Sequence, residues 1–172
     1  MLGLRPKRCE ARQALTVAEL ADALGPAADH FARAAAGLDE SQLRRRPADG
    51  EWCVNEVTAH VLHVETEVFL PRLRRMATED RPAFVAFTPE AWARERDHST
   101  DAFERSRNAF ARARAETLAF LRALPETAGE RLGLSGFFGP ISLVQYATHI
   151  ADHDIEHLRQ IQACARAATG RG

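Results

Sequence analysis

Residues 140–167 read PISLVQYATHIADHDIEHLRQIQACARA, and apolar residues recur along this stretch at every third or fourth position. This spacing predicts one long amphipathic helix that packs a single face against a core. The apolar stripe consists of Ala147, Ala151, Leu158, Ile161 and Ala165. Pro140 is expected as the first helical residue, where its missing N–H leaves no hydrogen bond unmade.

A second helix is predicted after Cys53, which stands where an N-cap would, with Glu56 three residues on in the place of a capping-box acid. Cysteine is a poor cap, so this start is less well specified than a serine would make it. Its core stripe is formed by valines, namely Val57, Val61, Val64 and Val68. Pro71 is expected to kink or end the helix near Leu70, although Leu73 and Met76 could continue the pattern beyond it.

Two more helices are predicted, one from about Val17 to Leu38 and one from about Thr100 to Leu124, where Pro125 stops it. Arginines are expected to cover the outside of the later helix. The connections are predicted as loops: Asp39–Trp52, Glu79–His98 with a short helical piece at Ala91–Arg96, and the glycine-rich Glu126–Gly139. Strand patterns are nearly absent, so we expect an all-α four-helix bundle. It is predicted as a single domain over 1–172, with a core at about 15–167 and flexible tails at 1–14 and 168–172.

The composition excludes several classes of protein. The 172 residues include 23 Lys and Arg against 24 Asp and Glu, so a basic nucleic-acid binder is disfavoured. No apolar run reaches the roughly 18 residues of a membrane span, and the first residues lack the apolar centre of a secretory signal, so a cytoplasmic protein is expected. Cys9, Cys53 and Cys164 are far apart and form no CxxC pair, which argues against a disulfide framework.

Histidines are the most informative polar residues. His153 and His157 are four apart, so they lie one above the other on one helix flank and can place two nitrogens on one ion. His60 borders the valine stripe of the second helix and can complete a three-histidine metal site with open coordination positions. His149 is the reserve ligand. The side chains of four histidines are expected to be solvated, namely His30, His63, His98 and His149.

Three neighbouring residues have weaker functional interpretations. Asp154 falls inside the apolar stripe, so it should be paired, either with a ligand histidine or with an arginine. Glu67 follows His60 by two turns and can orient a ligand or carry protons, although an ordinary solvated charge is the simpler interpretation. Cys164 is expected as core filler rather than a nucleophile.

Other metal sites fit less well. His153-Asp-Ile-Glu-His157 matches the H-x-x-E-H pattern of a metalloprotease, but that site needs a third ligand well downstream, where only 15 residues remain. A di-iron carboxylate bundle requires two Glu-x-x-His repeats, which do not occur near either histidine group. A hemerythrin-like site would need more histidines with bridging carboxylates.

Two segments resemble a known family. The first contains Arg46-Pro47, then Trp52-Cys53-Val54-Asn55-Glu56, then His60; the second is Gly139-Pro140-Ile141-Ser142-Leu143 followed by residues 149–161, HIADHDIEHLRQI. Both look like the signatures of the DinB/YfiT-like superfamily, in the expected order, and the resemblance covers about residues 15–167. Cys53 departs from the serine that the family usually has.

The resemblance implies a four-helix bundle in which His60, His153 and His157 bind a divalent metal. Imidazoles suit zinc, nickel and iron; we expect zinc or nickel, with iron or manganese as alternatives. Family members include transferases that use a thiol such as bacillithiol or mycothiol. Our first hypothesis is therefore an S-transferase that acts on a small molecule, with a low-molecular-weight thiol activated by the metal.

The alternatives are a hydrolase that uses metal-activated water and a non-catalytic, stress-related binding bundle. An apolar, arginine-rimmed cleft would favour an anionic thiol, and a narrow wet pocket would favour hydrolysis. A homodimer is a further expectation, from the base rate for bundles with exposed apolar seams.

Overall fold

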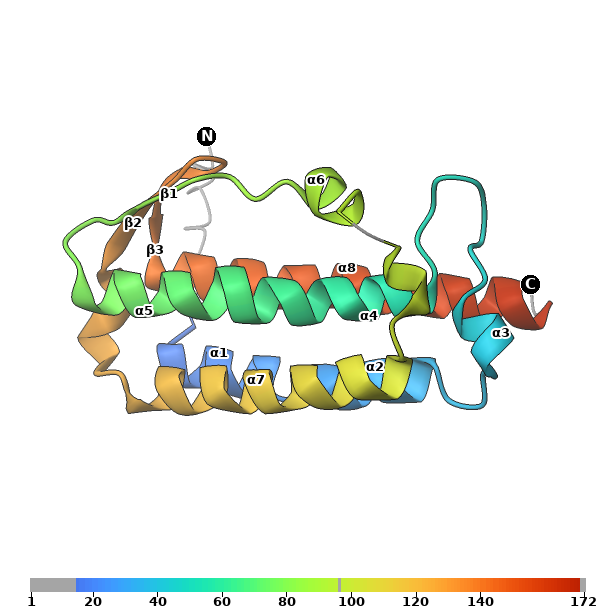
Figure 1. The fold of residues 1–172 in the computed structure, drawn as a ribbon. Helices are drawn as coiled ribbons and strands as arrows, with labels where there is room; N and C mark the ends of the chain where they lie inside the picture. The colour runs from blue at the N-terminus through green and yellow to red at the C-terminus, as the bar shows by residue number, and fades with distance from the viewer. Residues whose placement is uncertain (1–14, 96, 171–172) are drawn as a thin grey trace, which may run out of the picture.

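Four long helical stretches lie side by side along one axis of the molecule, as Figure 1 shows. The computed structural model describes residues 15–95 and 97–170. The helices are α1 Val17–Leu24, α2 Ala27–Ala34, α3 Glu40–Leu43, α4 Val54–His63, α5 Leu70–Thr78, α6 Pro89–Ala93, α7 Phe103–Ala123 and α8 Leu143–Thr169. The strands are β1 Ala83–Phe84, β2 Leu132–Ser135 and β3 Gly139–Ser142. The bundle is formed by α1 with α2, by α4 with α5, by α7 and by α8.

The first stretch is two helices, so the expectation of one helix over Val17–Leu38 is wrong. α1 begins in a capping box, in which Thr16 Oγ1 accepts from Glu19 N–H at 3.2 Å and Thr16 N–H donates to the Glu19 carboxylate at 2.8 Å. It ends at Gly25, and α2 starts after Pro26. Proline has no N–H and its ring clashes with the preceding turn, which explains the break.

The second stretch does not end at Pro71 but continues beyond it, with Leu73 and Met76 in the core. Between α4 and α5 the chain forms a π-helical turn over Val64–Phe69, in which the Leu70 N–H bonds to the carbonyl of Glu65, five residues back. The wider turn shifts the hydrogen-bond ladder by one residue just before proline, whose nitrogen has no hydrogen to donate. Pro71 therefore lies in the first turn of α5, where proline is tolerated.

A small sheet, which the sequence did not predict, covers one end of the bundle. β1 pairs with β2 in parallel and β2 pairs with β3 antiparallel, with Leu134 opposite Pro140. Pro140 is thus in an edge strand, where its missing N–H does not interrupt a ladder, and not at the start of a helix. α8 begins at Leu143 instead, because Ser142 Oγ accepts from Gln145 N–H at 3.2 Å in a capping box.

Two clusters of buried apolar side chains form the core, one toward the sheet and the other toward α2. One arginine is inside it. Arg114 of α7 is 2% exposed, contrary to the expectation that arginines cover the outside of this helix. Its five N–H groups bond to Glu65, Asp154 and the carbonyl of Leu24. A fully hydrogen-bonded guanidinium with two carboxylate partners can be buried.

Across the part of the chain that the structure describes, none of the helices has both the length and the apolar character of a membrane span. The predicted N-terminal tail, including Cys9, lies outside the described residues. At the other end α8 continues through Thr169, so the predicted tail at 168–172 is helical for its first two residues.

Candidate metal centre

α4 and α8 pack against each other and bring together the histidines that were predicted from two distant segments. One potential ligand atom from each of His60, His153 and His157 lies within 4.8 Å of the others. Nε2 of His153 and Nε2 of His157 are 3.1 Å apart. The ring of His60 has its centroid 4.8 Å from that of His157 and 5.4 Å from that of His153.

These distances fit one bound ion. Two nitrogens bound at about 2.0–2.1 Å in a tetrahedral site are roughly 3.3 Å from each other, close to the observed separation. Nδ1 of His60 and Nδ1 of His153 are buried and have no hydrogen-bond partner within the described ranges. The unpartnered nitrogen of His60 is available to an ion, whereas on His153 the nitrogen beside His157 is Nε2, so an ion bound there leaves the Nδ1 of His153 without a partner.

All three imidazoles are held in the neutral form, which has a lone pair for a metal. Burial, with a smaller contribution from the neighbouring histidines, lowers the pKa of His60 to about 3 and that of His153 to about 2. Burial also lowers the pKa of His157, although the hydrogen bond with Gln160 opposes this shift. No proton has to leave these rings before an ion binds at neutral pH.

Gln160 is a residue of this site that the sequence analysis missed. Its Oε1 lies 2.9 Å from Nδ1 of His157, one turn along α8. An amide oxygen only accepts hydrogen bonds, so Nδ1 of His157 carries the proton and Nε2 keeps its lone pair. The i, i+3 spacing between the two residues was a usable signal.

Aromatic side chains from the connections and from the π-helical turn surround the histidines. The ring centroid of His60 lies 4.9 Å from Trp52, 5.2 Å from Trp92 and 5.9 Å from Phe87. Phe69, at the end of the π-helical turn, lies 5.0 Å from His153. These rings restrict water around the ligand nitrogens. Trp52 and Phe87 belong to connections, whose course over the bundle cannot be inferred from helical periodicity.

A pocket of about 660 Å³ leads from the histidines to solvent between α6, α8 and the loop at Trp52. Its lining includes three carboxylates and one guanidinium, from Glu51, Glu90, Glu156 and Arg94. Gln160 also faces this pocket. The charged groups along the access route are therefore net acidic.

The two acidic residues considered as helpers of the metal lie elsewhere. Asp154 bonds to Arg114 and not to a histidine, at 2.5 and 3.0 Å. Glu67 is exposed. The reason is the π-helical turn, because directions counted at 100° per residue no longer hold beyond Val64. Glu65 is instead the buried acid of this segment, at 0% exposure.

The other histidines differ in how far their side chains are buried. His30 is exposed, as expected. His98 is buried, contrary to expectation: its ring stacks on Trp92 with centroids 3.8 Å apart and contacts Asp101 at 3.4 Å. His63 and His149 are half-buried against aromatic rings, and His149 is 6.4 Å from His153 between centroids.

Cys164 is buried, and its thiol donates to the carbonyl of Trp52 at 3.2 Å. Burial raises its pKa to about 11, so the thiol is not a ready nucleophile.

Comparisons with known proteins agree with this architecture. The family model of the DinB superfamily matches residues 23–161. A Geobacillus thermodenitrificans (strain NG80-2) protein named "Putative metal-dependent hydrolase" is 36% identical over 69 residues. The aligned part is 40% of this chain and 38% of that relative.

Among solved structures, YfiT from Bacillus subtilis, described as a probable metal-dependent hydrolase with an unusual four-helix bundle topology, matches with a TM-score of 0.79. The match covers 95% of this chain and 92% of YfiT at 20% identity. The prediction of an all-α four-helix bundle is confirmed.

Proposed function

Because this chain belongs to the DinB superfamily and brings three imidazoles to one point, we propose that it is a metal-dependent hydrolase of a small molecule. His60, His153 and His157 would hold the divalent ion. The observation that carries this proposal is the 3.1 Å separation between Nε2 of His153 and Nε2 of His157, with the His60 ring beside them. A divalent ion on three imidazoles supplies a bound water of lowered pKa at an open coordination position.

The remaining residues prepare the site for that ion. Gln160 holds the His157 ring with its lone pair available, and the aromatic side chains of Trp52 and Trp92 keep bulk water away from His60. Low local polarity strengthens electrostatic interactions at the centre of the site. At its mouth the pocket is wide enough for a small substrate and remains open to water.

The charge of the pocket favours hydrolysis over transfer of an anionic thiol. Glu51, Glu90 and Glu156 face it, against one cation from Arg94. Like charges at the entrance disfavour an anionic cosubstrate. The charged groups of the cleft are thus mostly acidic, whereas the S-transferase hypothesis called for a cleft rimmed by arginines.

Metal content tests the centre directly. Untagged protein incubated with Zn²⁺ or Ni²⁺ and then desalted should contain about one ion per chain, and the His153→Ala variant should contain little. The matched control is His30→Ala, which removes an exposed histidine and should leave the content unchanged. Equally low metal in wild type and in His153→Ala would refute the metal centre and leave the non-catalytic bundle.

Activity tests the reaction class. Metal-loaded protein should release p-nitrophenol from a panel of neutral p-nitrophenyl esters, and the His153→Ala variant should not. A parallel assay offers N-acetylcysteine with monobromobimane. Metal-dependent thiol consumption without ester hydrolysis would favour the S-transferase instead.

A further inference from the structure

Three carboxylates surround the pocket that leads to the histidines, and each comes from a different element. Glu51 belongs to the loop before α4, Glu90 to α6 and Glu156 to α8. All three are exposed, and the side chain of none of them forms an ion pair or a hydrogen bond with another described residue. Their charges are therefore available to a molecule that enters the pocket.

Glu156 is the carboxylate nearest in sequence to the candidate metal ligands. It follows His153 by three residues and precedes Gln160 by four, so the three side chains are neighbours on one face of α8, and all three line the pocket. At a rise of about 1.5 Å per residue, the backbone of Glu156 lies roughly 5 Å along the helix from that of His153. A positive charge beside Glu156 is thus only a few bonds away from a group held at the histidines.

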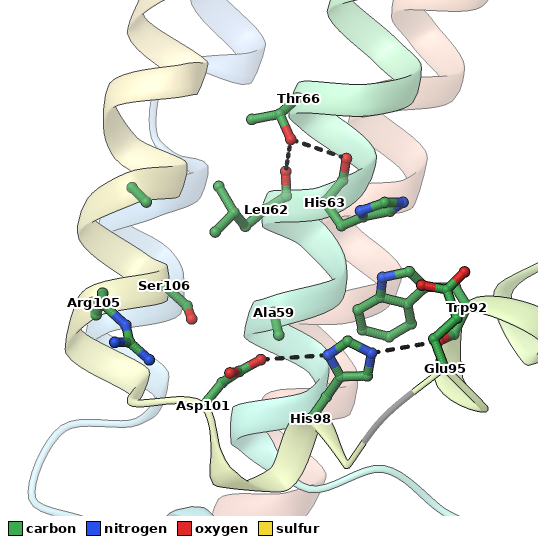
Figure 2. A pocket seen from close by; sticks show the side chains of 11 residues that line it. Ala59, Leu62, His63, Thr66, Trp92, Glu95, His98, Asp101, Arg105 and Ser106 are labelled. Carbon is green, nitrogen blue, oxygen red and sulfur yellow. Dashed lines mark hydrogen bonds and ion pairs between the residues drawn. The ribbon is translucent and has the colours of Figure 1, made fainter.

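The wall that carries Glu90 is held against the bundle by Trp92. The Trp92 ring stacks on that of His98 with centroids 3.8 Å apart, and Nε2 of His98 lies 3.4 Å from the carbonyl oxygen of Trp92. Figure 2 shows this side of α6, where the His98 ring lies between Asp101 and the end of α6. These contacts fix the helix from which Glu90 reaches the pocket.

The pocket differs in charge between its base and its mouth. At the mouth, the three carboxylates face one cation, Arg94, which has no ion-pair partner within residues 15–95 and 97–170. At the base, a divalent ion on the histidines would add positive charge. Trp52, next to Glu51, lines the pocket with an aromatic ring, which attracts a cation. A ligand with an electron-rich group at the base and a positive charge at the mouth matches this distribution.

The carboxylates are close enough to act together on such a ligand. A sphere of the volume of the pocket, about 660 Å³, has a radius of roughly 5 Å, far less than the Debye length of about 30 Å in 10 mM salt. Like charges around one concave site raise the local concentration of a cation and speed its arrival. In about 1 M salt the Debye length falls to about 3 Å, so this attraction is screened.

We propose that the histidine centre hydrolyses esters or amides that carry a positively charged ammonium group. The ammonium group lies among Glu51, Glu90 and Glu156, and the scissile carbonyl group lies at the histidines. Water adds its hydroxyl group to the carbonyl carbon, the bond from that carbon to the leaving oxygen or nitrogen breaks, and the leaving atom takes the remaining proton. This proposal rests on the hydrolase function proposed above and names its substrate class.

Three p-nitrophenyl esters of similar shape test the charge preference. Their acyl groups are the cationic 4-(trimethylammonio)butanoyl group, the uncharged 5,5-dimethylhexanoyl group and the anionic 4-sulfobutanoyl group. In about 10 mM salt, metal-loaded protein should hydrolyse the cationic ester with a kcat/KM roughly tenfold above that of the uncharged ester, and the anionic ester roughly tenfold below it. In about 1 M salt both ratios should fall below about threefold.

Variants locate the charge preference in this pocket. Glu156→Gln should lower the ratio of the cationic to the uncharged ester about threefold, and Glu51→Gln/Glu90→Gln/Glu156→Gln should abolish the preference. Arg94→Gln, which removes the opposing cation, should raise the ratio.

The matched control is Asp29→Asn/Asp80→Asn/Glu126→Gln, which removes three exposed carboxylates outside the pocket. It changes the net charge of the protein by the same amount as the triple variant of the pocket. It should keep the wild-type ratio, because the preference comes from the pocket and not from the overall charge.

Binding is measured separately from hydrolysis with two methyl ketones, which have no bond that water can cleave. 5-(Trimethylammonio)pentan-2-one is cationic, and 6,6-dimethylheptan-2-one is its uncharged counterpart. Calorimetry on metal-loaded protein in about 10 mM salt should give a Kd for the cationic ketone roughly tenfold below that for the uncharged ketone. The triple variant of the pocket should bind both alike.

The outcomes separate this proposal from the hydrolase function. Metal-dependent hydrolysis of all three esters at similar rates in low salt, or a cation preference that the triple variant of the pocket keeps, would overturn the substrate class and leave the hydrolase in place. Preferential binding of the cationic ketone without hydrolysis of any ester would support the ammonium site and refute the hydrolase. No binding of either ketone at about 10 mM, together with no hydrolysis, would overturn both.

Discussion

His157 is the ligand candidate whose two ring nitrogens have clearly different surroundings. Nδ1 lies 2.9 Å from the Gln160 amide oxygen, and Nε2 lies 3.1 Å from Nε2 of His153. The amide fixes the tautomer and the ring angle before any ion arrives. Outer partners of this kind raise metal affinity because the ligand loses less freedom on binding.

Replacing Gln160 therefore should weaken metal binding without removing a ligand. We expect Gln160→Leu to raise the Kd for Zn²⁺ about 10- to 100-fold. Gln160→Glu should keep wild-type affinity or exceed it, since a carboxylate accepts the same proton. Competition with a chromophoric chelator measures both values.

Gln162→Leu is the control for this variant, because Gln162 is exposed on the same helix. Imidazole ¹⁵N shifts in the metal-free protein provide an independent readout: His157 should be the Nδ1–H tautomer in wild type and lose that preference in Gln160→Leu. An unchanged tautomer together with an unchanged Kd would contradict the positioning role.

At the scale of elements, Arg114 ties three helical segments together. Its guanidinium on α7 binds Glu65 of the π-helical turn and Asp154 of α8, and Thr117 also donates to Glu65. Glu65 is fully buried and Asp154 is 7% exposed. Removing only the cation would leave two carboxylates in a medium that solvates them poorly.

Arg114→Met should therefore lower the free energy of unfolding by about 3–5 kcal/mol. The triple variant Arg114→Met/Glu65→Leu/Asp154→Leu should recover most of this loss, because no uncompensated charge remains. Urea unfolding followed by circular dichroism measures both. Arg112→Met, at an exposed position of α7, should change stability by less than about 0.5 kcal/mol. A single Arg114→Met variant as stable as this control would show that the network contributes nothing.

Two prolines show which features of the helices could be predicted from the sequence and which could not. Helical periodicity located all four stretches, but Pro26 divides one of them and Pro71 does not divide another. The difference comes from the π-helical turn, whose Glu65 is held by Arg114 and Thr117 from another helix. Periodicity within a single helix carries no information about such partners.

The small sheet was not predicted because its strands have two to four residues, too few for an alternating pattern.

At the scale of the whole molecule, the bundle places α4 beside α8, and the connections at Trp52, Phe87 and Trp92 cover the histidines. The i, i+4 pair, the flank position of His60 and the family resemblance together predicted which histidines meet. The aromatic cover was not predictable, because segments without periodicity supply it. Burial, to which this cover contributes, is the main cause that lowers the pKa of each imidazole.

The burial of three neutral histidines makes the stability of the metal-free protein depend on pH. In the unfolded chain each imidazole takes up a proton near its ordinary pKa of 6.5, whereas in the fold His60 and His153 do so only near about 3 and 2. Below pH 6.5 the unfolded chain therefore binds protons that the folded chain does not, and this favours unfolding. The stability that these histidines contribute is fully present above pH 6.5 and is lost progressively as the pH falls toward the pKa values of the folded protein.

Chelator-treated protein should consequently lose up to about 1.4 kcal/mol of unfolding free energy per histidine for each pH unit between 6.5 and 4.5. Urea titrations across this range measure the slope. The variant His60→Leu/His153→Leu should have a shallower slope, since two of the responsible groups are gone. His30→Gln, which removes an exposed histidine, should keep the wild-type slope. Identical slopes in all three proteins would mean that these imidazoles titrate normally in the fold, and that the aromatic cover does not exclude water from the centre.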